Sequence, residues 1–184
     1  ANVGAINRAT DRVALATIDG VVRVWSLATG RQVLGPLRTG PNPIALAFSP
    51  DGRWLAVGEQ TRDSPPAVRV WDTATGELKL TLSMGEGPGG GWVSSINFNA
   101  DGTRLVACDY ARKWNVWAVP SGERLTLQTE QGDTSSQMNA AVFSPDGRLV
   151  MLTDLTGAQL WDWASHRRVG QRISLPVRSD YVEF

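Results

Sequence analysis

The side chains that most often perform catalysis or bind metal ions are scarce in this chain. Among its 184 residues there is one histidine, His166, and one cysteine, Cys108. A Ser-His-Asp or Cys-His hydrolase needs a histidine beside its nucleophile, whereas His166 lies in a predicted surface turn, Ala164–Arg168. Zinc needs three or four cysteine or histidine ligands. The sequence therefore predicts no catalytic residue, no metal site and no cofactor, and we do not expect an enzyme.

Three further features have structural rather than chemical interpretations. The glycine-rich stretch Gly85–Gly91 is followed by Trp92 and a predicted strand, not by the Lys-Ser/Thr pair and helix of a phosphate-binding loop. The repeated Asp-Gly pairs lack the further acidic ligands at alternate positions that a calcium loop has. Cys108 follows an apolar run, as a small buried side chain does. We interpret these features as a flexible loop, turns and core.

Composition narrows the class of protein. Eighteen basic and eighteen acidic residues give a formal net charge of zero, so no overall field favours nucleic acid or an anionic membrane. No apolar run approaches the roughly 20 residues that span a bilayer, and the start at Ala1 shows no signal-peptide pattern. A single cysteine fits a reducing compartment. We expect one domain in the cytoplasm, with no nucleic-acid or membrane partner.

A repeat of about 45 residues organises the chain. Phe48-Ser-Pro-Asp-Gly52 leads to Val68-Arg-Val-Trp-Asp72, and two later copies run from Phe98 to Trp117 and from Phe143 to Asp162. The repeat tryptophans Trp25, Trp71, Trp117 and Trp161 are 46, 46 and 44 residues apart. This period is typical of one four-stranded propeller blade. We predict repeats at about 1–40, 41–90, 91–136 and 137–178, with a stub at 179–184.

Each repeat is predicted to hold four short strands. In the second repeat they are Ile44–Phe48, Trp54–Val57, Val68–Trp71 and Leu78–Leu82. Their nearly continuous apolar character indicates sheets that are covered on both faces. Ser-Pro-Asp-Gly and Ala-Thr-Gly sequences supply tight turns after the first and third strands.

The two ends of the chain are less regular. Val3–Asn7 aligns without gaps on Val93–Asn97, which puts Arg8 where the other copies have phenylalanine. The last strand of the fourth repeat is predicted at Arg168–Leu175, and Tyr181–Phe184 matches the first strand of a fifth repeat. The expected fold class is therefore all-β, with four propeller blades and a stub.

With these residues the chain resembles the WD-repeat β-propeller family over nearly its whole length. The matching residues are the Trp-Asp pairs at Trp71 and Trp161, the looser copies at Trp25 and Trp117, and the turns that follow Phe48 and Phe143. The family's Gly-His pair is absent, and an aspartate six residues before the tryptophan occurs only as Asp19. The resemblance implies a propeller that binds proteins, whose stability depends more on apolar burial between blades than on the family's polar network.

The long or irregular connections all fall on one predicted face of the propeller. They are Glu59–Pro66, Gly85–Trp92, Asp109–Lys113 and Glu130–Gln137. Variable loops on a rigid scaffold often bind partners, and aromatic and arginine side chains dominate such contacts. The candidate partner-binding residues are Arg62, Trp92, Tyr110, Arg112 and Lys113. The alternative is that Trp92 only covers a blade edge and Tyr110 is rim. Trp54 and Trp114 are expected in the core, and Trp163 fits either place.

Two functions remain open at this stage. The first is a non-catalytic scaffold that binds an unknown protein through the variable loops, and the second is an assembly element whose end blades associate. Rings of this family usually have seven or eight blades. In a ring of eight, each blade is rotated by about 45° from the one before it. Four blades would then form half a ring, which a second copy or further blades of a longer protein would complete. A homodimer of two four-bladed halves is the slightly favoured prediction.

Overall fold

The computed structural model of the chain describes residues 3–40, 42–61, 65–85, 91–126 and 138–174. These residues form fifteen β-strands, which confirms the predicted all-β class. No helix long and apolar enough to cross a membrane occurs in the described ranges. Arg62, most of Gly85–Gly91, Glu130–Gln137 and Tyr181–Phe184 lie outside them.

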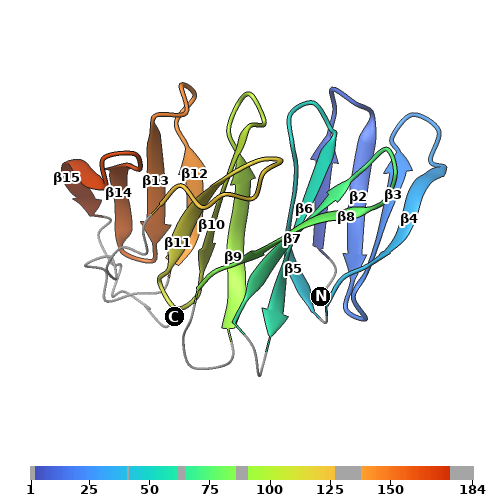
Figure 1. Cartoon of the computed structure of the whole chain (residues 1–184), viewed down its shortest axis with the longest axis horizontal. Coiled ribbons are helices and arrows are strands. Elements are labelled where there is room, and N and C mark those ends of the chain that lie inside the picture. The colour runs from blue at the N-terminus through green and yellow to red at the C-terminus, as the bar shows by residue number, and fades with distance from the viewer. Residues whose placement is uncertain (1–2, 41, 62–64, 86–90, 127–137, 175–184) are drawn as a thin grey trace, which may run out of the picture.

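The strands form four antiparallel units in chain order, which we number blades 1 to 4 (Figure 1), and a short ladder joins blades 2 and 3 into one seven-stranded sheet. Blade 1 has β1 (Val3–Asn7), β2 (Arg12–Thr17), β3 (Val21–Ser26) and β4 (Gln32–Arg38). Blade 2 has β5 (Pro43–Phe48), β6 (Trp54–Thr61), β7 (Ala67–Asp72) and β8 (Leu78–Ser83). Blade 3 has β9 (Gly91–Phe98), β10 (Arg104–Asp109) and β11 (Trp114–Ala118), and a single bridge joins Trp117 to Arg124. Blade 4 has β12 (Met138–Phe143), β13 (Leu149–Asp154), β14 (Gly157–Asp162) and β15 (Arg167–Ser174).

The blades stand side by side in a row, with blades 1 and 4 at its two ends (Figure 1). Their first strands, β1, β5, β9 and β12, contact one another in this order. The turns after first and third strands lie along the upper edge in Figure 1, which we call the turn edge. The opposite edge, where second strands end and first strands begin, we call the loop edge.

The turns after the first strands confirm the predicted turn chemistry. Gly52 and Gly147 both have φ of 70°, which a residue with a Cβ rarely adopts. The Ser49 hydroxyl accepts a hydrogen bond from Trp54 N–H and donates to the Asp51 carboxylate, and that second bond lowers the pKa of Asp51. Asp51 therefore holds its turn together through the Ser49 hydroxyl.

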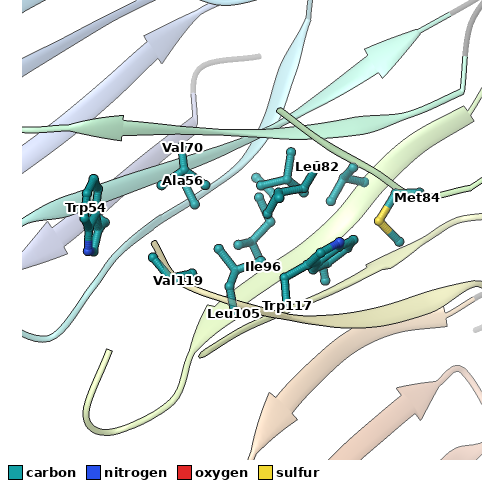
Figure 2. Close-up of a cluster of buried hydrophobic side chains, with 13 residues drawn as sticks. Trp54, Ala56, Val70, Leu82, Met84, Ile96, Leu105, Trp117 and Val119 are labelled. Atoms are coloured by element: carbon teal, nitrogen blue, oxygen red, sulfur yellow. The ribbon is translucent and has the colours of Figure 1, made fainter. Parts of the chain in front are cut away.

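Apolar packing between blades forms the core. We call the face of a blade that meets the preceding blade its N-side face, and the opposite one its C-side face. One buried cluster fills each of the three joints, and Figure 2 shows the one between blades 2 and 3. There Val70 and Leu82 of blade 2 face Ile96, Leu105 and Trp117 of blade 3. Each inner blade is thus covered on both faces, as the continuous apolar strands predict.

The repeat tryptophans occupy these joints to different extents. Trp71 and Trp117 are 3% and 2% exposed and lie in the clusters of their N-side faces. Trp161 is only partly buried, although its place in the repeat predicts burial between blades as for Trp71 and Trp117. Its ring lies 5.9 Å from that of Trp114 between centroids, and the Arg168 guanidinium lies 5.4 Å from it. Trp54 and Trp114 are buried, as predicted.

The register of blade 1 corrects the predicted alignment of the first repeat. Phe48 pairs with Leu55, which pairs in turn with Trp71. In blade 1 the corresponding chain runs from Ile6 through Val13 to Trp25. Ile6, not Arg8, therefore occupies the phenylalanine position, and Arg8 lies in the following turn. The match to Val93–Asn97 was shifted by two residues because alternating strands keep the same face at that shift.

We predict that Trp71→Ala or Trp117→Ala lowers the free energy of unfolding by about 3–5 kcal/mol, because each opens a cavity in a joint. Urea unfolding followed by fluorescence of the remaining tryptophans measures the change. A loss below about 1 kcal/mol for both variants would contradict the role assigned to the joints.

Candidate functional site

Two of the candidate aromatic residues lie together on the loop edge. The rings of Trp92, at the start of β9, and Tyr110, after β10, are 4.0 Å apart between centroids and tilted by 41°. Tyr110 N–H also donates to the Trp92 carbonyl at 3.1 Å. Both side chains are partly exposed. They therefore form an aromatic pair that is fixed by backbone and ring contacts and still open to solvent.

The short turn after β10 holds Tyr110 in this place. Asp109 is buried, and one of its carboxylate oxygens accepts a hydrogen bond from Lys113 N–H at 2.8 Å. The backbone closes the same turn through Asp109 N–H to the Lys113 carbonyl at 2.8 Å. Arg112 adopts φ of 68°, a left-handed conformation that the closed turn requires. Local hydrogen bonds thus fix the conformation of this turn.

An open pocket of about 330 Å³ adjoins the pair at the joint of blades 2 and 3. Ile44, Gln60, Trp92 and Ser94 line it. Gln60 and Trp92 are paired strand residues, since the end of β6 forms a short antiparallel ladder with the start of β9. The pocket therefore has one aromatic and one aliphatic wall and two side chains that can form hydrogen bonds.

Buried carboxylates support the loop edge in three blades. Glu59, Asp109 and Asp154 occupy the same register, each eleven residues after the phenylalanine of its repeat, and Thr17 takes this position in blade 1. Glu59 pairs with Arg69 at 2.9 Å and accepts a hydrogen bond from Gly40 N–H. Asp154 pairs with Arg172 at 2.6 Å. Each carboxylate fixes a neighbouring turn or strand at this edge.

These carboxylates were not predicted from the sequence. Their constant distance from Phe48, Phe98 and Phe143 was the available signal. The distance from each carboxylate to the repeat tryptophan is not constant, because the turn between the second and third strands differs in length from blade to blade.

The other predicted residues are placed as follows. Arg112 and Lys113 lie beside Tyr110, partly exposed, and each has an interaction partner. His166 has φ of 56° in the turn between β14 and β15, five residues after its repeat tryptophan, where the other three repeats have glycine. Trp163, for which two places were open, is partly buried and donates a hydrogen bond to the Gly147 carbonyl.

Burial controls the titration of two neighbouring side chains in β10. It raises the pKa of the Cys108 thiol to about 12, so the sulfur remains protonated and weakly nucleophilic at neutral pH. It also raises the pKa of Asp109, and the hydrogen bond from Lys113 N–H only partly opposes this shift. Within the described ranges, no three histidine, cysteine or acidic side chains gather where they could hold a metal ion.

Comparison with known proteins shows similarity to repeat proteins of one kind. The family model described as "WD domain, G-beta repeat" matches residues 34–72 and 77–118. Each match runs from the region of a fourth strand to the Trp-Asp position of the next blade, so the sequence repeat overlaps two blades.

Individual relatives share part of their length with the chain. Rat apoptotic protease-activating factor 1 is 26% identical over 83% of this chain and 12% of that protein. The guanine nucleotide-binding protein subunit beta of Arabidopsis thaliana is 31% identical over 58% of the chain and 29% of that protein. A Schizosaccharomyces pombe periodic tryptophan protein 2 homolog is 30% identical over 68% and 14%, respectively. The chain thus spans less than a third of each of these relatives.

We predict that Asp109→Asn stabilises the protein at pH 7, with a gain that disappears as the pH falls below about 4. A folded-state pKa above the unfolded one means that ionisation opposes folding, so wild-type stability is lost as the pH rises through the raised pKa. Asparagine keeps an oxygen for Lys113 N–H and carries no charge. Urea unfolding of both proteins across this pH range tests the prediction. A variant that is less stable than wild type at pH 7 would contradict it.

Proposed function

The chain belongs to the WD-repeat family, and from this membership we propose that it is a non-catalytic scaffold that binds a protein partner through its loop edge. WD-repeat propellers are scaffolds for protein interaction. The aromatic, arginine and lysine side chains gathered at the loop edge support this choice of surface.

The observation that carries the proposal is the Trp92–Tyr110 pair. Tryptophan, tyrosine and arginine are the side chains that most often dominate binding energy at protein interfaces. Here a partly exposed tryptophan and tyrosine are already in contact before any partner binds, and Arg112 follows in the same turn. Because the turn is closed by Asp109 and Lys113, binding costs little conformational entropy.

The pocket beside the pair suggests how a partner would be oriented. Its aromatic and aliphatic walls suit an apolar side chain, while the Gln60 side chain offers a hydrogen bond to a partner's backbone. The partners of the relatives are not assigned to this chain, because it spans only part of each of them.

A second candidate function is assembly through the end blades, in the form of a homodimer. Of the nine large apolar side chains that are exposed in the described ranges, eight belong to blades 1 and 4 and one to blade 2. Apolar side chains gathered at the surface of a soluble protein often mark an interaction site. This function and the first are compatible, since the loop edge and the ends of the row are different surfaces.

We predict that the double variant Trp92→Ala/Tyr110→Ala, and separately Arg112→Glu, weakens partner binding by at least about tenfold. The matched control is Arg148→Glu, the same charge reversal at an exposed site on the turn edge. Proteins that co-purify with tagged wild type and variants from the source cells, identified by mass spectrometry, provide the readout.

The expected result is a protein retained by wild type and by Arg148→Glu and depleted by both loop-edge changes, at unchanged thermal unfolding. Equal retention by all four proteins would overturn the loop edge as the binding surface. Loss with Arg148→Glu alone would place binding on the turn edge instead.

A further inference from the structure

We propose that a second copy of the chain covers both ends of the row. The N-side face of blade 1 in one copy would pack on the C-side face of blade 4 in the other, at two equivalent joints that close an eight-bladed ring. The inference rests on the second proposed function and identifies the faces and residues that would form the joint.

No described residue covers the N-side face of blade 1 as a preceding blade covers the same face of blades 2, 3 and 4. Leu15 is 44% exposed, whereas its register equivalents Val57, Ala107 and Leu152 are 0%, 0% and 5% exposed. Ile6 is 63% exposed, although its equivalent Phe48 packs against the cluster of the joint to the preceding blade. Ile6 and Leu15 are thus apolar, like the residues that fill a joint in the other blades, but no neighbouring blade in the described ranges covers them.

The glycine in the turn after the third strand of blade 1 also has no described neighbouring blade beside it. A Cβ added to Gly76 would lie 3.2 Å from Leu34 of the preceding blade, and one added to Gly122 would lie 3.0 Å from Leu80. Gly30, at the same position in blade 1, has nothing within 4 Å of such a Cβ. Glycine at this position lets the turn lie against a fourth-strand leucine of the neighbouring blade.

The C-side face of blade 4 carries the complementary residues. Val169 pairs with Leu160, as Leu34 pairs with Val24, so Val169 occupies the position against which a turn glycine lies. Ile173 is 62% exposed, whereas its register equivalents Leu37 and Leu82 are 5% and 3% exposed. This face is therefore also that of a joint without its neighbour.

A third position links the two ends to each other. The residue that opens the second strand meets the residue two places after the repeat tryptophan of the next blade. Arg12 Nη1 lies 2.6 Å from Thr73 Oγ1, Trp54 shares a buried cluster with Val119, and the Arg104 guanidinium lies 5.1 Å from the Trp163 ring. In the proposed joint between two copies, the same positions hold Leu149 of blade 4 and Leu27 of blade 1, so both facing residues are apolar.

A second copy would supply both complementary faces at once, whereas further blades of a longer protein would leave the 184-residue chain alone monomeric. The contact is head to tail, so it forms a closed ring only if the blade rotation closes, and eight blades at about 45° satisfy that condition. A formal net charge of zero adds no general repulsion between copies.

The test uses Ile6→Asp and Ile173→Asp, one on each end face, in light scattering after size exclusion. Ile18→Asp is the matched control, because Ile18 is also in blade 1 and is 62% exposed but lies in the β2–β3 turn on the loop edge. Wild type and Ile18→Asp are expected at twice the 19.9 kDa chain mass at micromolar concentration. Each end-face variant is expected to raise the dimer dissociation constant by at least about 100-fold, since it places an unpaired charge in both joints.

The outcomes separate the inference from the function on which it rests. A wild-type monomer would overturn both and would point to further blades of a longer protein as the cover of the end faces. An assembly larger than two copies would also overturn both. A wild-type dimer that neither end-face variant weakens would leave self-association standing and overturn the joint. Circular dichroism of each variant shows that it retains its strands, so a monomer can be attributed to the lost contact.

Discussion

Every blade of this protein has two apolar faces, and the fold depends on covering both. A four-stranded antiparallel sheet can usually leave one face to water, with polar residues at alternate positions. Here the second strands are apolar on both sides: Leu55 and Val57 pack towards blade 1, while Trp54 and Ala56 pack towards blade 3. A single blade could not be stable alone, so stability is shared between neighbours, as in other repeat proteins. Within the described residues, the outer faces of blades 1 and 4 have no neighbouring blade.

The same constraint explains where a binding surface can arise. Since the blade faces are committed to packing, variation is confined to the two edges, and the turn edge is restricted by its repeated Ser-Pro-Asp-Gly chemistry. At the loop edge the buried carboxylates Glu59, Asp109 and Asp154 anchor connections of different lengths to one scaffold. Asp109 bears a desolvation cost, visible in its raised pKa, to close the turn that presents Tyr110 to Trp92. Rigid support of this kind is what an interaction site on a scaffold requires.

Much of the fold follows from local sequence, because the repeat carries its own registers. The strands of the second repeat are predicted to within a few residues, since turn glycines and prolines bound them on both sides. The first repeat is misaligned because Ile6 gives no aromatic marker and a shift of two residues preserves the alternation. The candidate site is less predictable. Trp92 and Tyr110 can be placed on one edge by topology. Their contact, however, depends on the exact shape of the Asp109–Lys113 turn and on the β6–β9 ladder, which joins two blades.

Hydrogen–deuterium exchange in dilute and in concentrated solution tests most directly whether blade faces need neighbours. Strands β6, β7 and β10 are covered on both faces within one chain, so their protection should not change with concentration. Strands β2 and β3 of blade 1 and β14 and β15 of blade 4 should exchange faster in dilute solution and become protected in concentrated solution. Exchange of the end blades that is as slow as that of the inner blades, and equal at both concentrations, would contradict the account.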